Sequence, residues 1–350
     1  MIQIDPKELD ANPFLLNTPS LTIDLKQGIE SARLHAPHDY LTKQTAMDPS
    51  DEGSDLWLDA LNKFFCGDEE LIEYVQRIAG LAAIGTVKIE FMVIAYGDGR
   101  NGKSTFWNSM AHVLGSYSGT ISPDILTKNC RRNPKPEMAE LRGKRIVIAA
   151  ELEEGTRLSS SMVKQICSTD DVKGEKKYKD PLDFKPSHTL IMYTNFLPRV
   201  GSLDDGTWRR LVVVPFDAHI SGRSDIKNYT EYLFENAGGA ILSWIIEGTR
   251  KIIAEGYWLE MPAAVKRAIE AYSEENNWLK HFLEEECDVA PTLTEKSGAL
   301  FSAYREYCER TGEYYRSTTD FYSALSRAGF GRRRNSSGSV IYGLKLKERT

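Results

Sequence analysis

The stretch "YGDGRNGKST" at residues 96–105 decides how this chain is interpreted. Residues 97–104 match the pattern G-x-x-x-x-G-K-[ST] in full, directly after the apolar run "FMVIAY" at 91–96 and before a stretch compatible with a helix. In this strand–loop–helix context the pattern marks a phosphate-binding loop (P-loop). Because glycines let backbone N–H groups converge on phosphate oxygens at a helix N-terminus, the loop predicts a nucleoside triphosphate site.

The loop residues have expected parts in binding ATP and Mg²⁺, the two predicted cofactors. Lys103 is expected to reach the β- and γ-phosphates, and the Ser104 hydroxyl is expected to hold Mg²⁺. The residues assigned to the nucleotide are Gly97, Asp98, Gly99, Arg100, Asn101, Gly102, Lys103, Ser104 and Thr105.

Three more apolar runs accompany the strand before the loop: "RIVIAA" (145–150), "TLIMYTN" (189–195) and "RLVVVPF" (210–216). Continuously apolar runs are typical of strands buried on both faces of a parallel sheet. The predicted fold class is therefore α/β, a P-loop ATPase core with a mainly parallel sheet. Helical periodicity precedes it at 54–65 and 68–85, where Asp68 is a predicted N-cap.

Polar side chains that follow these strands are the candidate catalytic residues. Glu151 is predicted to hold the Mg²⁺ shell and polarise water, with Glu153 or Glu154 as the second acid, unless those two only form a solvated turn. Asn195 is predicted to orient the attacking water, although a strand-ending turn residue is the alternative. Arg209 and Arg210 could be surface charge, or could reach a neighbouring subunit's γ-phosphate.

Four segments in this order and spacing carry a resemblance: "YGDGRNGKSTF", "GKRIVIAAELEEG", "LIMYTNFLPRV" and "DDGTWRRLVVVPF". Together they resemble the superfamily 3 helicase domain of phage and plasmid primase–helicases, which are relatives of the poxvirus primase–helicase. The region upstream of residue 84 is similar to the helical region that precedes that domain.

The resemblance implies an AAA+-type ATPase that forms a hexameric ring, with ATP bound between subunits. It implies that Lys103 and Ser104 bind nucleotide, that Glu151 is the Walker B acid and Asn195 the sensor, and that Arg209 and Arg210 are arginine fingers. It also implies a bacterial host cell and a primase that is either separate or fused.

By the same resemblance, the segment "VKQICSTDDVKGEKKYKDPLDF" (163–184) corresponds to a family motif that leads into a DNA-gripping pore loop. Ser168–Asp170 and Glu175 differ from the residues common there. Lysine charges would track phosphates and an aromatic ring could stack on a base, whereas a solvated charged loop is the alternative. The candidate DNA contacts are Lys173, Lys176, Lys177, Tyr178 and Lys179.

The end of the chain is basic, with 11 Lys and Arg against 6 Asp and Glu over 291–350, while the whole chain carries a net charge of −6. Its pattern reads helix, helix and hairpin, which fits a winged helix, and Ser317 with Asp320 predicts a helix cap. Arg332, Arg333 and Arg334 are candidate phosphate contacts. A domain that only packs on the core is the alternative.

Composition narrows the class of protein. A hydrophobic share of 41% and a charged share of 27% are ordinary for a globular protein. Five scattered cysteines predict reduced thiols in a cytoplasmic protein. No apolar run is long enough to span a membrane and no signal peptide is apparent.

The sequence therefore predicts a ring-forming, ATP-dependent DNA helicase of a phage or mobile-element replication system. Its expected regions are a helical N-terminal part (1–83), the ATPase core with a helical lid (84–285) and a winged helix (286–350). No segment is long enough for a primase domain. Two other functions remain open: a replication initiator whose ATPase drives origin assembly, and a small-molecule kinase, which the arginine pair and the basic tail disfavour.

Overall fold

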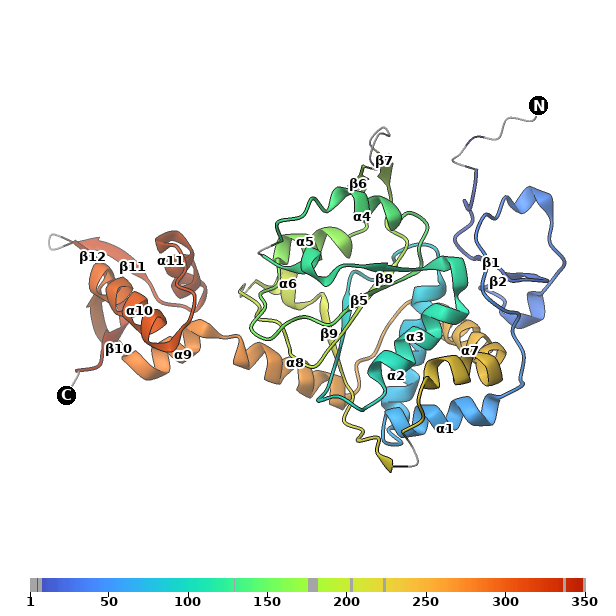
Figure 1. Ribbon diagram of the computed structural model, residues 1–350. Coiled ribbons are helices and arrows are strands. Elements are labelled where there is room, and N and C mark those ends of the chain that lie inside the picture. Colours follow the sequence, from blue (N-terminus) through green and yellow to red (C-terminus); the bar gives the residue numbers. More distant parts are fainter. Residues whose placement is uncertain are drawn as a thin grey trace. The chain divides into compact units, whose positions relative to one another are not determined.

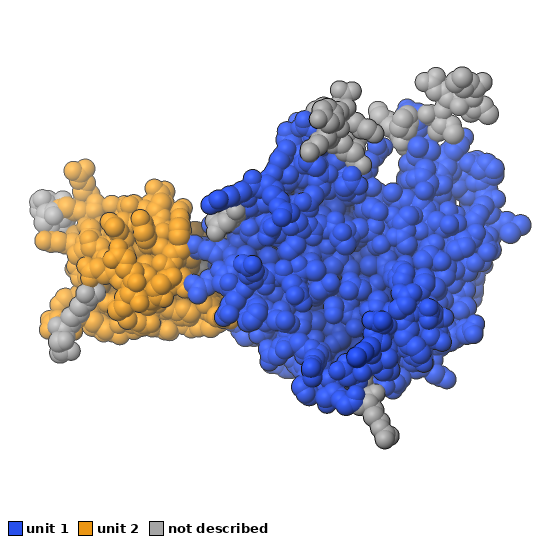
Figure 2. Space-filling model, viewed as in Figure 1, with its two compact units in different colours: residues 1–272 blue, residues 273–350 orange. Residues whose placement is uncertain are grey.

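The computed structural model describes residues 5, 8–128, 130–175, 182–201, 204–222, 225–335 and 338–348. The chain forms two compact units, residues 1–272 and 273–350 (Figure 2). This division differs from the predicted one at 83 and 285. Residues 1–83 are not separate because Leu61 and Val75 belong to the same core as Val212 of the sheet.

A five-stranded parallel sheet forms the centre of the first unit, in the order β4-β5-β8-β3-β9 (Figure 1). The four predicted strands are confirmed to within one residue at each end. The sheet also contains a short, partly polar strand that the apolar runs did not indicate. The strands are β3 (Met92–Tyr96), β4 (Ser118–Ile121), β5 (Ile146–Ala150), β8 (Thr189–Thr194) and β9 (Leu211–Pro215).

Helices cover both faces of this sheet (Figure 1). Alternate strand residues point to opposite faces, so Val93 joins the core shared with helices α1, α2, α3 and α7, whereas Ile94 joins the core shared with α4 and α5. Within the described residues, no helix combines the length and apolar character needed to cross a bilayer. The helices are α1 (Ser54–Phe64), α2 (Glu69–Ala83), α3 (Lys103–Val113), α4 (Lys135–Glu140), α5 (Ser160–Ile166) and α7 (Tyr229–Ala254).

A buried arginine joins the N-terminal segment to the sheet. Arg145, just before β5, donates hydrogen bonds to the carbonyl oxygens of Ala83 (2.5 Å) and Leu15 (2.6 Å). Its guanidinium also lies 4.2 Å from the centroid of the Tyr117 ring. Leu15 begins β1 (Leu15–Asn17), which pairs antiparallel with β2 (Thr22–Asp24). These contacts explain why residues 1–83 are part of the first unit.

The described residues of the second unit form three helices, besides the end of α8 (Ala263–Glu275), and a three-stranded antiparallel sheet of order β10-β12-β11. The predicted helix–helix–hairpin pattern is confirmed, and the Ser317 hydroxyl accepts from the Asp320 N–H at the predicted cap. The unit begins earlier than predicted because Trp278 and Phe282 pack against the Tyr304 ring. Its elements are α9 (Trp278–Glu286), β10 (Cys287–Lys296), α10 (Ser297–Thr311), α11 (Thr318–Arg327), β11 (Arg332–Asn335) and β12 (Gly338–Leu346).

Candidate functional site

The strand register brings the predicted site residues to one edge of the sheet. Tyr96 at the end of β3 pairs with Thr194 of β8 and Pro215 of β9, and Ala150 of β5 pairs with Tyr193. The carboxyl ends of these strands are therefore level, and the residues that follow them meet there. We call residues 97–102, which join β3 to α3, the glycine loop.

A cavity of about 330 Å³ lies beside the glycine loop. Its volume is within the range of small-molecule sites. The predicted residues Lys103, Ser104, Glu151 and Asn195 all line it. Its other lining residues are Phe64, Gly99, Arg100, Asn101, Gly102, Thr105, Tyr193, Ile220, Asp225, Ile226 and Tyr229.

Two glycines of the loop leave no space for a side chain. A Cβ atom on Gly97 would lie 2.3 Å from the Asn101 Nδ2 atom and 2.3 Å from the Phe216 carbonyl oxygen. A Cβ atom on Gly102, whose φ is +84°, would lie 2.1 Å from the Phe64 ring. Asn101 in turn donates to the Phe216 carbonyl oxygen over 2.9 Å, which fixes the loop against the segment after β9.

The Lys103 ammonium points back into the glycine loop. Its Nζ atom donates to the Gly97 carbonyl oxygen (2.8 Å), to Asn101 Oδ1 (3.3 Å) and to Asn195 Oδ1 (2.6 Å). Burial lowers the pKa of Lys103, and the charges on Glu151 and Asp98 act in the opposite direction. Lys103 is only 6% exposed, but it lines the cavity. Its three hydrogen bonds all go to uncharged oxygen atoms.

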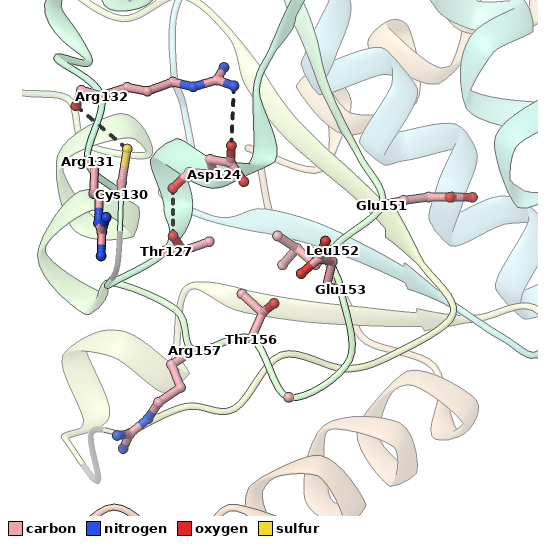
Figure 3. A pocket seen from close by; sticks show the side chains of 11 residues that line it. Asp124, Thr127, Cys130, Arg131, Arg132, Glu151, Leu152, Glu153, Thr156 and Arg157 are labelled. Atoms are coloured by element: carbon pink, nitrogen blue, oxygen red, sulfur yellow. Dashed lines mark hydrogen bonds and ion pairs between the residues drawn. The ribbon is translucent and has the colours of Figure 1, made fainter.

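Glu151 leaves the sheet through an unusual backbone turn. Its φ is +39°, a left-handed value that non-glycine residues seldom adopt, and its N–H donates to the Tyr193 carbonyl oxygen over 3.0 Å. In Figure 3 its side chain points away from the neighbouring Leu152 and Glu153. Because of this turn, Glu151 lines the glycine-loop cavity, whereas the next residue, Leu152, does not.

Glu153 lines a second hollow of about 600 Å³ and not the cavity of the glycine loop (Figure 3). Glu151 borders both hollows. Arg131, Arg132 and Arg157 also line the second hollow, and Arg132 approaches Asp124 to 3.8 Å. Glu154 is exposed in the turn that follows Glu153.

The loop residues fit a magnesium–nucleotide complex in their chemistry. The Ser104 hydroxyl is exposed in the first turn of α3, and Glu151 offers a carboxylate across the cavity. Over the described part of the chain, no group of three or more His, Cys, Asp or Glu could hold a metal by itself. Magnesium commonly takes one or two protein ligands and completes its shell with phosphates and water, so this donor set suits it.

The two predicted arginine fingers have different environments. Arg210 is 9% exposed, donates to the Gly206 carbonyl oxygen over 2.6 Å and forms an ion pair with Glu90. These contacts hold its guanidinium within the first unit, whereas an arginine finger needs a guanidinium that can extend outward. Arg209 is exposed at the end of the short helix α6 (Asp205–Trp208).

Glu90 also links Arg210 to Thr169, which lies in the predicted DNA-gripping segment. The Thr169 N–H and hydroxyl donate to Glu90 Oε1 over 3.1 and 3.2 Å. The hydrogen bond from the Thr169 N–H, with the Arg210 charge, lowers the pKa of Glu90. The ion pair lies at the amino end of the sheet, because the Met92 N–H donates to the Arg210 carbonyl oxygen there.

The predicted DNA-gripping segment includes a two-stranded hairpin, β6 (Val172–Gly174) and β7 (Leu182–Phe184). Lys173 is exposed on β6, whereas Lys176, Lys177, Tyr178 and Lys179 lie outside the described residues. The hairpin packs against α4, since a Cβ atom on Gly174 would lie 2.6 Å from the Ala139 backbone. Glu175 pairs with Lys135 over 2.9 Å.

The three predicted arginines of the second unit lie on β11 and are exposed. The Arg332 guanidinium lies 4.0 Å from the centroid of the Tyr322 ring, and that of Arg333 lies 5.9 Å from the Tyr342 ring. Arg332 and Arg334 alternate with Arg333 along the strand, so the two faces of the hairpin share the charge.

Sequence reasoning missed the apolar side of the glycine-loop cavity. Phe64, Ile220, Ile226 and Tyr229 line it, but they come from α1, from the segment after β9 and from the start of α7. Helical periodicity indicates that Phe64 is buried without indicating what it contacts. For Ile220 and Ile226 no sequence signal was available.

The fold and site define an α/β protein with a glycine-rich loop at the carboxyl edge of a parallel sheet. Two family models match the chain. The model described as "D5 N terminal like" matches residues 1–66. The model described as "Family of unknown function (DUF5906)" matches residues 95–210, which include the loop, Glu151, Asn195 and both arginines.

Curated relatives come from large DNA viruses. "Putative helicase L207/L206" of Acanthamoeba polyphaga mimivirus is 28% identical over 225 residues, covering 61% of this chain and 23% of that protein. "Primase D5" of Fowlpox virus is 25% identical over 167 residues, covering 46% and 21%. "Putative helicase 184R" of Invertebrate iridescent virus 6 is 23% identical over 334 residues, covering 83% and 34%. The chain thus spans about a fifth to a third of these relatives.

The predicted resemblance is confirmed: the chain is related to the primase–helicases of the D5 type. Among solved structures, the apo structure of the NrS-1 C-terminal region (305–718) matches with a TM-score of 0.53. That match covers 86% of this chain and 78% of the other at 13% identity. It therefore supports the α/β fold alone.

Proposed function

We propose that this chain is the ATP-hydrolysing motor of a replicative DNA helicase that works as a ring. The observation that carries the proposal is the meeting of Lys103, Ser104, Glu151 and Asn195 around one cavity at the carboxyl edge of the sheet. Ligands of open parallel sheets bind at this edge, where successive connections leave the sheet in opposite directions. In the order β4-β5-β8-β3-β9, the chain runs from β3 toward β4 on one side and from β8 to β9 on the other side. That point therefore lies between the neighbouring strands β3 and β8, beside the glycine loop.

Each of these side chains has a part in ATP hydrolysis. Lys103 would neutralise the β- and γ-phosphates, and Ser104 and Glu151 would hold Mg²⁺ and its water shell. Asn195 would orient the attacking water from the end of β8. The glycine loop suits this assignment because Gly97 and Gly102 let the backbone approach a phosphate without an intervening Cβ.

The position of Arg209 supports the proposed ring. This exposed residue comes just before β9, at the amino end of the sheet, whereas the glycine loop follows the carboxyl end of β3. Arg209 is therefore placed away from its own nucleotide and is suited to act on that of a neighbouring subunit. Such a finger is commonly worth roughly 10³–10⁵ in rate. By the resemblance, six subunits would form the ring.

DNA contacts are proposed for two separate surfaces. The β6–β7 hairpin with Lys173 would track the phosphate backbone of a strand. The second unit, with three helices followed by a basic hairpin, would act as a winged helix whose Arg332, Arg333 and Arg334 contact phosphates. Basic contacts of this kind position DNA without reading its sequence.

ATP hydrolysis by single-site variants tests the proposal. Lys103→Ala should lower the hydrolysis rate by about 10²-fold or more, since it removes charge that stabilises the transition state. Glu151→Gln should retain ATP binding and lose hydrolysis. Lys26→Ala, at an exposed lysine of the N-terminal segment, is the matched control and should hydrolyse ATP like the parent.

Phosphate release and ATP binding would be measured on the same preparations. Unchanged hydrolysis in Lys103→Ala would place the active centre elsewhere and would remove the basis of the proposal.

A further inference from the structure

The glycine-loop cavity also has an apolar part, and a triphosphate does not account for it. Lys103, Ser104, Glu151 and Asn195 form the polar side. The cavity is also lined by Phe64, Ile220, Ile226 and Tyr229, which we call the apolar wall. The aliphatic and aromatic carbon atoms of these side chains offer phosphates and magnesium no favourable contacts, so the wall suits a different occupant.

The apolar wall is attached directly to the glycine loop. Phe64, the last residue of α1, is 1% exposed, and its ring occupies the space that a side chain at Gly102 would need. Phe64 and Tyr229 meet edge to face, with ring centroids 6.3 Å apart. The Ile220 N–H donates to the Arg100 carbonyl oxygen over 2.7 Å. The wall and the phosphate side are thus held in one fixed arrangement.

The wall is partly open toward the cavity. Tyr229 is half-buried at the start of the 26-residue helix α7, so a long element holds its position. Ile226 is 44% exposed. Tyr229 is neutral at physiological pH in any case, and burial raises its pKa further. A neutral ring and an aliphatic side chain beside a phosphate site offer a surface for a flat apolar group.

We propose that the apolar wall binds the purine base of the nucleotide, with the base packed against Tyr229 and Ile226. This rests on the proposed function, in which the polar side of the cavity holds the triphosphate. A purine presents a larger ring face than a pyrimidine, and stacking on an aromatic side chain does not depend on base-edge groups. The site therefore accepts ATP and GTP with similar affinity and binds CTP more weakly.

Binding of ATP and of inorganic triphosphate, both with Mg²⁺, separates the two sides of the cavity. In the full chain, Tyr229→Ala should weaken ATP binding roughly tenfold and leave triphosphate binding unchanged. Tyr229→Phe, which retains the ring, should bind ATP like the parent. Tyr232→Ala is the matched control, because Tyr232 stacks on Tyr229 with centroids 5.9 Å apart but does not line the cavity.

Two results would overturn the inference. Equal weakening of ATP and triphosphate by Tyr229→Ala would mean that the ring only supports the loop, and no weakening of either would mean that the base lies elsewhere. Ile226→Ser, at an exposed position, repeats the test without disturbing α7.

The outcomes also distinguish this inference from the proposed function. If Lys103→Ala abolishes binding of both probes while Tyr229→Ala changes neither, only the base site fails. If Lys103→Ala leaves both probes bound, the proposed function fails first.

Discussion

The Lys103 ammonium contacts three oxygen atoms, and the shortest of these hydrogen bonds is to Asn195 Oδ1 at 2.6 Å. A γ-phosphate oxygen would compete with Asn195 for the same donor. Nucleotide binding would then release the Asn195 amide, at the end of β8, to contact the phosphate or the attacking water. Such an exchange would let one lysine link phosphate binding to β8, the strand between β3 and β5.

The sequence predicted which polar residues follow the strands. It did not predict which of the two adjacent arginines is buried. Glu151 and Asn195 follow apolar runs, so their meeting at one sheet edge follows from a parallel sheet. Arg210 was paired with Arg209 because the two are adjacent in sequence. Its partner Glu90 lies 120 residues away, and only the fold brings the two together. No local pattern separates the buried arginine from the exposed one.

His188 makes the stability of the fold depend on pH. It is buried next to β8, and neither ring nitrogen has a hydrogen-bond partner among the described residues. Burial lowers the pKa of His188 to about 4. The unfolded chain binds a proton near pH 6.5, so stability is complete above that pH and is lost as the pH falls toward 4.

Unfolding by urea at pH 7 and pH 5 measures this effect. Between these values His188 should cost about 2 kcal/mol of stability. His188→Leu should reduce the difference between the two pH values by about that amount, whereas His38→Leu, at an exposed position, should not. An identical pH dependence in His188→Leu and the parent would refute the assignment.

At the scale of elements, α2 and α7 cross with their backbones in contact. A Cβ atom on Gly80 would lie 2.2 Å from the Gly248 carbonyl carbon, and one on Gly248 would lie 2.2 Å from the Gln76 carbonyl oxygen. The Thr249 hydroxyl donates to the Gly80 carbonyl oxygen over 2.9 Å at the same crossing. Glycine lowers helix propensity, so these residues are explained by the close approach of the helices.

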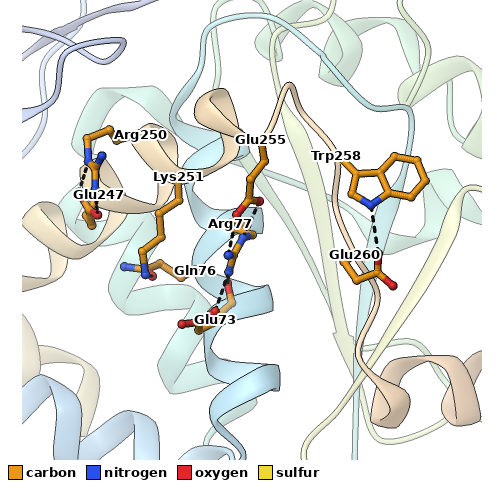
Figure 4. Close-up of polar contacts among 9 residues, drawn as sticks. All are labelled: Glu73, Gln76, Arg77, Glu247, Arg250, Lys251, Glu255, Trp258 and Glu260. Atoms are coloured by element: carbon orange, nitrogen blue, oxygen red, sulfur yellow. Dashed lines mark hydrogen bonds and ion pairs between the residues drawn. The ribbon is translucent and has the colours of Figure 1, made fainter.

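Side chains reinforce the crossing near its exposed end (Figure 4). Arg77 of α2 lies between Glu73 and Glu255, and it donates twice to Glu255 over 2.8 Å. Lys251 of α7 donates to Gln76 over 2.8 Å. Exposed ion pairs of this kind contribute at most about 1 kcal/mol each, so the glycine contact is the larger factor.

Gly248→Ala should destabilise the first unit although alanine is the better helix former. Forcing backbone atoms apart typically costs about 1–3 kcal/mol, more than the roughly 1 kcal/mol gained in propensity. Gly298→Ala in α10, where a Cβ atom would meet nothing within 4 Å, is the control and should be neutral or slightly stabilising. Denaturant unfolding followed by circular dichroism measures both. A stabilised Gly248→Ala variant would contradict the close crossing.

Sequence periodicity predicted most elements and missed those without it. The 68–85 helix begins as expected, because the Asp68 carboxylate accepts from the Leu71 N–H over 3.0 Å. β10 was not predicted because Pro291 interrupts it and its register shifts between Val289 and Thr294. An irregular strand has no strict alternation, and only its pairing with β12 defines it.

At the scale of the whole molecule, the two compact units divide the chain at a different place from the predicted regions, for one common reason. The predicted boundaries follow residue 83 and lie at the end of α9, where the sequence pattern changes. Residues 1–83 and α9 each pack against residues that are distant in the chain. Composition marks changes of pattern along the chain, whereas a unit is defined by which side chains pack together. The family match at residues 1–66 therefore concerns part of the first unit.

We propose that ATP bound at the glycine loop drives separation of DNA strands. The direct measurement is unwinding of a forked DNA by the full chain with ATP and Mg²⁺, compared with Lys103→Ala at equal occupancy of the fork. The account predicts strand separation by the parent and none by Lys103→Ala. ATP hydrolysis and DNA binding by the parent without strand separation would contradict it and would favour an initiator that uses ATP for assembly.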